Sequence, residues 1–206
     1  MKNKKRNFSS FDLAEAFKAL GLVKLIEWNL EIEPITPGDF YHERIRRLKD
    51  HFDVATSERA KELLIDAICD EALLNHSQLK MWKAAPIQSE DLTGIADYVA
   101  APKRRYLDNP LLCVVEAKKD DFEQGLAQCL VEMKACQQSN EQVASRIDIY
   151  GIVTNGDAWR FYKLSVEGQV YESRLYVIGE IEDVLGYLNY VFTQCANNIA
   201  VFAKAA

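Results

Sequence analysis

The sequence predicts an α/β protein with a mixed central sheet flanked by helices, and three observations favour this fold class. Short runs rich in β-branched and aromatic residues alternate with segments whose apolar residues recur at helical spacing. Turn-forming sequences, Asn-Gly and Asp-Asn-Pro among them, separate neighbouring strand-like runs. Through the middle of the chain the predicted order is helix, three strands, helix and two further strands.

The composition is that of an ordinary globular protein. The chain has 206 residues, of which 49% are hydrophobic and 27% are charged, so it can bury a substantial core. We expect an N-terminal extension, 1–55, packed on a core domain, 56–206, within one compact unit. No apolar run is long enough to span a bilayer, and the basic start lacks an apolar signal core, so we expect a cytoplasmic protein without a membrane partner.

The N-terminal extension is expected to contain two helices and an extended segment. Residues 8–22 predict a helix with Ser10 or Asp12 as its cap. Residues 25–32 alternate imperfectly between apolar and polar, which indicates a strand or an extended arm. A short basic helix is expected at about 39–51.

The core domain opens with a helix that carries two acids on one face. Ser57 is a typical N-cap residue, and apolar residues at helical spacing continue to about Leu74. Glu58 and Glu62 are four residues apart and therefore share a face. Acids are favourable at a helix start for electrostatic reasons alone, so a role in a site needs support from other residues.

Three strands follow, and the last two form the centre of the predicted fold. The first strand covers 79–86, and a loop at 88–91 leads to the second, which starts at Gly94 and breaks at Pro102. The third strand covers 112–119. It begins with apolar residues and ends with charged ones, as expected for a strand that leaves a core and enters a cleft.

Charged side chains gather where the third strand ends. Side chains alternate between the two faces of a strand, so Val114, Glu116 and Lys118 project from one face. Asp97, on the neighbouring strand, brings a second carboxylate to the same place. Two carboxylates and a lysine at a sheet edge predict a site for a hard divalent cation and an activated water.

The second half of the chain predicts a long helix and a hairpin. The helix starts at Asp120 and Asp121, and Gln128 lies off its apolar stripe. Strands at 147–153 and 159–164 enclose the sequence Thr-Asn-Gly-Asp, which favours a type I′ turn because Asn and Gly tolerate positive φ.

The chain is expected to end with a hairpin and a helix. The hairpin turns at Glu167-Gly168 and ends near residue 178. The helix covers about 180–203, and its apolar stripe is expected either to pack on the core or to bind a second copy of the chain.

Cysteine and histidine patterns argue against disulfides and zinc. The five cysteines are an odd number without a C-x-x-C pair, so buried free thiols are expected. The three histidines, His42, His51 and His76, are too scattered for a histidine-based metal site or a catalytic triad.

The charge of the chain is unfavourable for nonspecific binding to nucleic acid. The formal net charge is −6, whereas such binding usually needs a basic surface. Three local basic clusters, at 4–6, 44–49 and 103–105, are candidate phosphate contacts. Taken singly, each is explained as well by a solvated face or loop.

At these residues the chain resembles the PD-(D/E)XK nuclease superfamily, and especially the nuclease domains related to type I restriction endonuclease subunits. The matching residues are Asp97, the sequence Glu116-Ala117-Lys118, and Gln128 on the following helix, with a Thr-Asn-Gly hairpin after them. The resemblance covers roughly 57–164. It departs from the signature at Ala96, where the superfamily name implies proline.

The resemblance implies a restriction endonuclease-like αβββαβ core, here with an added N-terminal segment and a long C-terminal helix. It also implies Mg²⁺-dependent hydrolysis of DNA phosphodiester bonds, with Mn²⁺ as a substitute, in restriction or in defence against mobile elements. The implied partners are DNA, a second copy bound through the C-terminal helix, and a protein that supplies specificity.

The resemblance also suggests a role for each residue of the motif. Asp97, Glu116 and the Ala117 carbonyl would bind the metal ion. Lys118 would orient or deprotonate a water beside it. Gln128 would hold Lys118 or the scissile phosphate. Either Glu58 or Glu62 would bind a water of the metal shell or a second ion.

Two other interpretations remain open at this point. The chain is alternatively a non-catalytic subunit with the same fold that binds nucleic acid or serves in assembly. Or the Asp and Glu-x-Lys residues form a surface ion-pair cluster in an unrelated α/β interaction protein. This alternative predicts that Glu116 pairs with Lys118 or an arginine on an open surface, with no cavity beside Asp97.

Overall fold

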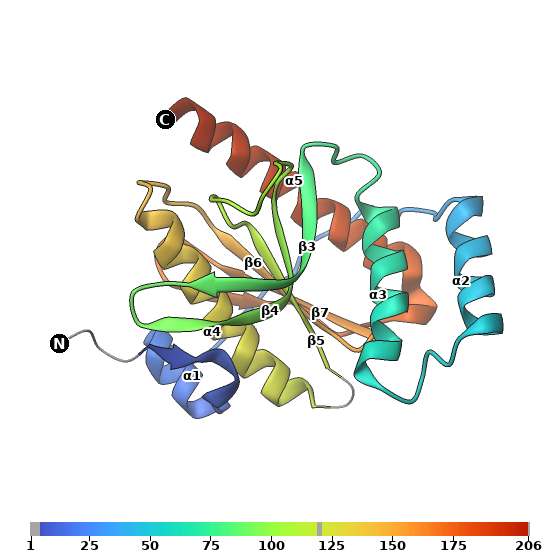
Figure 1. The fold of residues 1–206 in the computed structure, drawn as a ribbon, viewed down its shortest axis with the longest axis horizontal. Helices are drawn as coiled ribbons and strands as arrows, with labels where there is room; N and C mark the ends of the chain where they lie inside the picture. The colour runs from blue at the N-terminus through green and yellow to red at the C-terminus, as the bar shows by residue number, and fades with distance from the viewer. Residues whose placement is uncertain (1–4, 119–120, 206) are drawn as a thin grey trace.

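One mixed sheet organises the molecule (Figure 1). The structure, a computed structural model, describes residues 5–118 and 121–205. The strand order is β1-β4-β5-β6-β7-β8-β2, with β3 paired to β4 and β9 paired to β7. Neighbours β5 and β6 are parallel, whereas β4 with β5 and β6 with β7 are antiparallel. The predicted α/β class with a mixed sheet is therefore confirmed.

The sheet and its covering layers are built from the following elements. The strands are β1 (Arg6–Asn7), β2 (Ile26–Glu27), β3 (Leu79–Gln88), β4 (Leu92–Pro102), β5 (Cys113–Ala117), β6 (Ile149–Thr154), β7 (Ala158–Leu164), β8 (Val170–Glu172) and β9 (Tyr176–Val177). The α-helices are α1 (Leu13–Leu20), α2 (Asp39–His51), α3 (Glu58–Ala72), α4 (Phe122–Glu141) and α5 (Ile181–Ala205).

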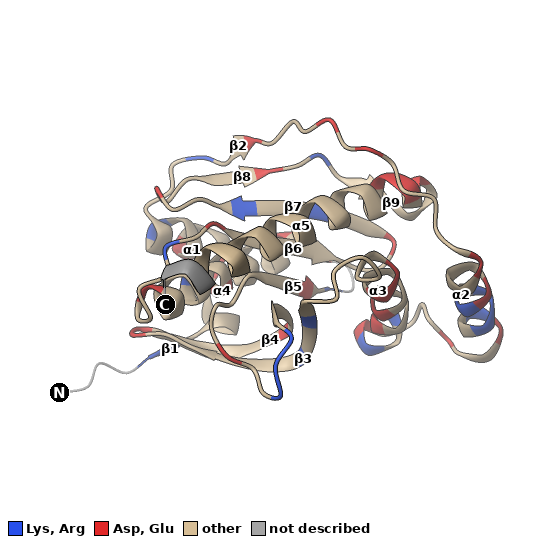
Figure 2. Ribbon diagram, turned by 90° about the horizontal axis from the view of Figure 1, so that it is seen from above, with Lys and Arg blue, Asp and Glu red and all other residues tan. Residues whose placement is uncertain are grey.

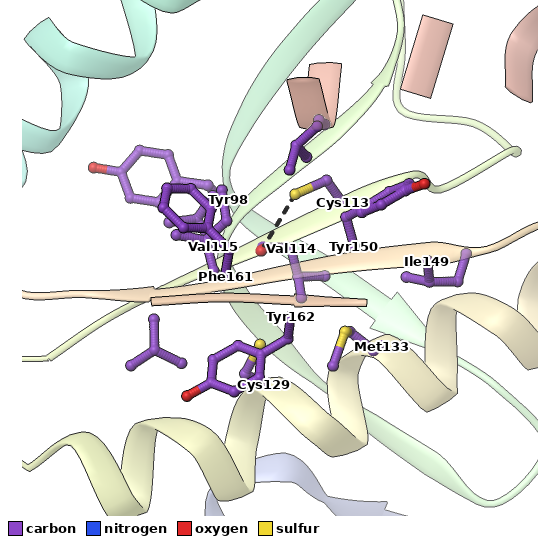
Figure 3. Close-up of a cluster of buried hydrophobic side chains, with 14 of the residues drawn as sticks. Tyr98, Cys113, Val114, Val115, Cys129, Met133, Ile149, Tyr150, Phe161 and Tyr162 are labelled. Atoms are coloured by element: carbon purple, nitrogen blue, oxygen red, sulfur yellow. Dashed lines mark hydrogen bonds between the residues drawn. The ribbon is translucent and has the colours of Figure 1, made fainter. Parts of the chain in front are cut away.

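Helices cover both faces of the sheet, and α3 lies between the sheet and α2 (Figures 1 and 2). On one face Phe161 stacks on Tyr187 of α5, with ring centroids 4.2 Å apart. On the other face Cys129 and Met133 of α4 pack against β6. Figure 3 shows this alternation, with Val115 and Phe161 above the sheet and Cys129 below it.

Side-chain caps fix where three of the helices, α1, α3 and α4, begin. Asp12 accepts from the Glu15 N–H at 2.8 Å and completes a capping box, so the first helix begins after Asp12, later than the predicted residue 8. Ser57 caps α3, as predicted. Asp121 caps α4, while Asp120, also predicted at this start, lies outside the described residues.

The hairpin of β3 and β4 is longer than predicted. The expected strand over 79–86 continues to Gln88, and β4 begins at Leu92, so the predicted loop at 88–91 shrinks to three residues. Pro86 does not end the strand because β3 pairs with β4 alone and lies at the edge of the ladder, where a missing N–H is tolerated. The third predicted strand ends at Ala117, and Lys119 lies outside the described residues.

The predicted type I′ turn between β6 and β7 is wrong. A type I′ turn needs positive φ at both central residues, but only Gly156 has it, with φ of 83°. Instead, the Asn155 side-chain oxygen accepts from the N–H groups of Asp157 and Ala158, at 3.0 and 2.8 Å. A side chain that satisfies the turn's backbone donors replaces the conformation expected from the Asn-Gly pair.

The long C-terminal helix packs on its own sheet. Its predicted stripe is buried from Val184 to Cys195, and Ile199 is half-buried. The structure thus shows the first of the two expected uses of this stripe, and a homodimer through α5 stays a prediction. Within the described residues, no helix has both the length and the apolar character needed to cross a membrane.

Close contact between α4 and β6 requires glycine at position 151. A Cβ atom there would lie 2.6 Å from both Cys129 Sγ and Met133 Sδ. We expect Gly151→Ala to lower the free energy of unfolding by about 1–3 kcal/mol, because the overpacked core must shift. Denaturant unfolding measures this, with Gly179→Ala as the control, because nothing lies within 4 Å of a Cβ at Gly179. Equal stability of the two variants would contradict the prediction.

Candidate functional site

Asp97 and Glu116 face each other across β4 and β5. The register pairs Tyr98 with Val115, so Asp97 and Glu116 are the next pair along the two strands. Asp97 Oδ2 accepts a hydrogen bond from the Ala117 N–H at 2.8 Å, which fixes its carboxylate over the end of β5. Glu116 is only 2% exposed. The structure therefore brings together the two carboxylates that the sequence placed on neighbouring strands.

Lys118 completes this group. Its Nζ lies 2.7 Å from Glu116 Oε1, and its side chain is 16% exposed. Its backbone N–H donates to the Thr154 carbonyl at 2.8 Å, which extends the pairing of β5 with β6 by one residue. The lysine stem passes close to α4, where a Cβ at Gly125 would lie 2.9 Å from Lys118 Cγ. Strand pairing and helix packing together hold the lysine in place.

The backbone of β3 is irregular opposite Asp97. The ladder with β4 is continuous on both sides but omits the pair of Ala84 with Asp97. Ala84 has φ of 47°, in the left-handed region that L-residues other than glycine rarely adopt. Such conformations cost about 1–3 kcal/mol and concentrate at functional sites. This irregularity is consistent with a site at Asp97.

Glu132 on α4 is a further acid of the site, and the sequence reasoning missed it. It is fully buried, and neither of its carboxylate oxygens has a hydrogen-bond partner among the described residues. Its carboxyl group lies against that of Glu116, whose Oε2 is also buried and unpartnered. Two carboxyl groups in contact can hydrogen-bond only if one of them keeps its proton. The sequence held one indication of this residue: Glu132 is an acid among the apolar residues of the helix stripe that includes Met133.

Burial and like charge raise the pKa values of the acids. Burial, then the charge of Asp97, raises the pKa of Glu116 to about 7. Burial, then Glu116, raises the pKa of Glu132 well above its usual range. Burial also raises the pKa of Asp97, although the Ala117 N–H and Lys118 oppose this. The acids of this group therefore keep their protons to a higher pH than exposed carboxyl groups do.

Lys118 keeps its proton in this environment. Burial by itself would lower its pKa, but the charges of Glu116, Glu58 and Asp97 outweigh burial and raise it. The side chain is therefore an ammonium ion that donates hydrogen bonds. It is therefore not a ready base.

The two candidate acids of α3 differ in their surroundings. Glu62 Oε2 pairs with Lys83 Nζ at 3.0 Å, whereas Glu58 has no such ion pair among the described residues. Both raise the pKa of Asp97, and Glu58 also acts on Lys118. Glu58 is therefore the better candidate for the site.

Gln128 lies on α4 four residues before Glu132 and so shares its side of the helix. Its side chain is half-buried, and it makes no hydrogen bond within residues 5–118 and 121–205. Its predicted contact with Lys118 or a phosphate stays a prediction.

The donor set fits a hard cation with few protein ligands. Among the described residues, no group of three or more His, Cys, Asp or Glu side chains is arranged to hold a metal ion. Mg²⁺ does not require one, because it binds through one or two carboxylates and keeps several waters. Asp97 and Glu116 supply two carboxylates, and Glu116 Oε2 is a buried oxygen beside the carboxyl group of Glu132. A ligand role for the Ala117 carbonyl stays a prediction.

The comparisons with known proteins add no relative. No model of a known protein family matches the chain, and no curated protein sequence matches it.

Proposed function

We propose that this protein is a Mg²⁺-dependent endonuclease that hydrolyses DNA phosphodiester bonds on a restriction endonuclease-like fold. The observation that carries the proposal is the meeting of Asp97, Glu116 and Lys118 at the end of β5. Glu116 pairs with Lys118, as a surface ion-pair cluster would also predict, but Glu116 is buried rather than solvated. Burial, then the charge of Asp97, raises its pKa, while Lys118 acts in the opposite direction. A cation bound beside these carboxyl groups would favour their ionised forms, which supports a metal site here.

The arrangement of elements supports the finer fold assignment. Helix α3, the antiparallel strands β3 to β5, helix α4 and strand β6 follow in the order expected for an αβββαβ core. Strands β5 and β6 are parallel and joined by α4, which carries Glu132 and Gln128. The site lies where β5 ends, next to the N-terminal turn of α3.

The residues of the site have separate tasks in this proposal. Asp97 and Glu116 would hold the metal ion, which when bound polarises the phosphate and makes water a better nucleophile. Glu58 would accept a hydrogen bond from a water at the rim of the site. Gln128, whose side chain makes no hydrogen bond to another described residue, would orient the scissile phosphate or Lys118.

Lys118 acts as a cation in this reaction. Because its pKa is raised, its ammonium group would hold the attacking water by a hydrogen bond and offset the charge that develops on the phosphorane oxygens. Glu116 holds the ammonium group at 2.7 Å, which keeps it beside the carboxylates that would hold the metal ion.

A metal-dependence experiment tests the proposal. Purified protein should nick or cut plasmid DNA in Mg²⁺ or Mn²⁺ and lose this activity in EDTA. Asp97→Asn should weaken Mn²⁺ binding, measured by calorimetry, by about tenfold or more, since it removes one charged ligand. Glu90→Gln, at an exposed acid just before the same strand, should bind Mn²⁺ like the unmodified protein.

The outcomes separate the candidate functions. Mn²⁺ binding that depends on Asp97, without cleavage of any DNA form, would favour the non-catalytic subunit. Equal Mn²⁺ binding by Asp97→Asn and Glu90→Gln would contradict the metal site at Asp97, and the nuclease proposal would then fail as well.

A further inference from the structure

An open hollow of about 540 Å³ lies beside α3, away from the carboxylates of the site. Its walls come from α2, α3, β3, β4 and the loop after β4. Five basic and two acidic side chains line it, a net charge of +3, in a chain whose formal charge is −6. The basic residues are Arg44, Lys80, Lys83, Lys103 and Arg104, and the acidic ones are Asp66 and Asp70.

Two of the three basic clusters found in the sequence meet here. Arg44 belongs to the cluster on α2, where Figure 2 shows several basic residues, and Lys103 and Arg104 belong to the cluster after β4. These clusters are some sixty residues apart in the chain, so the sequence alone does not show that they share a surface. Because the two clusters share one surface, they are not simply two separate solvated segments.

Three of the five basic side chains in the hollow form ion pairs with carboxylates of the described residues, and two lysines do not. Arg44 pairs with Asp70, Arg104 pairs with Asp108, and Lys83 pairs with Asp66 at 3.0 Å. Lys80 and Lys103 have no carboxylate partner among the described residues. The Lys80 ammonium lies over the Trp82 ring, 4.1 Å from its centroid, which restrains an otherwise exposed side chain.

The hollow and the site lie along the same helix. Lys83 lines the hollow and pairs with Glu62, whose charge acts on Asp97. At 1.5 Å per residue, Asp66 and Leu73 in the hollow wall stand roughly 12 and 22 Å along α3 from Glu58. With about 3.4 Å of rise per base in one strand, that is roughly four to six nucleotides from the scissile position.

We infer that this hollow binds the phosphodiester backbone of DNA a few nucleotides from the cleavage point, with Lys80 and Lys103 as its free phosphate contacts. The inference rests on the proposed nuclease function for the identity of the polyanion. It accounts for how an acidic protein holds DNA. The carboxylates at the cleavage point repel phosphate, and the basic hollow supplies the attraction at a distance.

The test is DNA binding measured by fluorescence anisotropy in EDTA, where no cleavage occurs. Short labelled single-stranded and duplex DNA are titrated with the unmodified protein and with Lys80→Gln/Lys103→Gln, over a range of salt concentrations. We expect the double variant to bind at least one DNA form about tenfold more weakly or worse, and the slope of log K against log salt to fall by about two. Whichever form shows both effects is the ligand.

A matched control removes the same charge elsewhere. Lys18→Gln/Lys24→Gln changes two exposed lysines on and just after α1 and should bind DNA nearly as the unmodified protein does. Equal losses in the two double variants would mean a nonspecific charge effect and would overturn the inference. So would unchanged binding in Lys80→Gln/Lys103→Gln, or no DNA binding by the unmodified protein.

These results are independent of cleavage. If binding depends on the hollow but Mg²⁺ and Mn²⁺ give no cleavage, the inference stands and the nuclease proposal fails. If DNA is cleaved but Lys80→Gln/Lys103→Gln binds DNA as tightly as the unmodified protein, the nuclease proposal stands and the inference fails.

Discussion

Replacing Lys118 by methionine should lower Mg²⁺-dependent DNA cleavage by about a thousandfold, because a positioned cation that contacts the reacting group typically contributes that much. Methionine keeps most of the stem that packs beside Gly125 and removes only the ammonium group. The loss should appear mainly in kcat, since the lysine acts on charge that develops in the transition state. Cleavage of supercoiled plasmid under single-turnover conditions measures it.

Lys163→Met is the matched control for this experiment. Lys163 is 21% exposed, close to the 16% of Lys118, and it also pairs with an acid, Asp148, at 3.8 Å. It lies on β7 and takes no part in the site. We expect this variant to cleave DNA at nearly the unmodified rate. Retained cleavage in Lys118→Met, with both variants folded by circular dichroism, would sink the catalytic assignment.

The metal-free protein should lose stability as the pH rises, and Glu132→Gln should remove much of that loss. Glu116 has a pKa of about 7 in the folded protein, and that of Glu132 is also raised well above its usual range by burial and by Glu116, whereas both ionise near 4.5 when unfolded. The folded state therefore holds more protons than the unfolded state above pH 4.5, so the free energy of unfolding falls as pH rises. The stability that these two carboxyl groups contribute is fully present below about pH 4.5. It is lost as the pH rises through about 7, where Glu116 ionises in the folded protein.

The effect is large for a single buried pair. A shift from 4.5 to about 7 corresponds to a few kcal/mol, on the order of 3, at 1.36 kcal/mol per pKa unit. Glu132→Gln removes one ionisable group, keeps the shape of the side chain, and offers Glu116 an amide donor. At about pH 8, without metal, we expect this variant to be more stable than the unmodified protein by about 1–3 kcal/mol.

Denaturant unfolding at about pH 5 and about pH 8, in EDTA, measures this prediction. Glu141→Gln supplies the control, since Glu141 is an exposed acid at the end of the same helix and its removal should leave the pH dependence unchanged. The same slope with pH in Glu132→Gln and Glu141→Gln would show that the Glu116 and Glu132 carboxyl groups are not coupled as described.

Local patterns were sufficient for most of the elements. The helical period and its caps located α3 and α4, because capping and amphipathicity depend on residues within one or two turns. Alternation along β5 placed Glu116 on one strand face and Asp97 beside it. Two further details also have local causes. Asp12, one of the two predicted caps, is the one that caps α1, because it forms a capping box with Glu15. The predicted type I′ turn was wrong because the Asn155 side chain accepts hydrogen bonds from the backbone N–H groups of the turn.

Other features depended on contacts between distant segments. Glu132 is an ordinary acid of a helix until α4 packs on β5 and buries it against Glu116. The choice between Glu58 and Glu62 followed from Lys83, whose position on β3 nothing in the α3 sequence specifies. The basic hollow likewise exists only because α2 and the loop after β4 approach the same part of α3.

The sequence by itself determined the α/β class, the helices with their caps, and the placing of Asp97 on one strand beside Glu116 and Lys118 at the end of the next. These depend on periodicity and pairing, which are short-range. Only the tertiary structure decided which charges are buried, which are neutralised and which remain free. Burial and Coulomb interactions are set by three-dimensional distance and by exclusion of water, and neither can be obtained from separation along the chain.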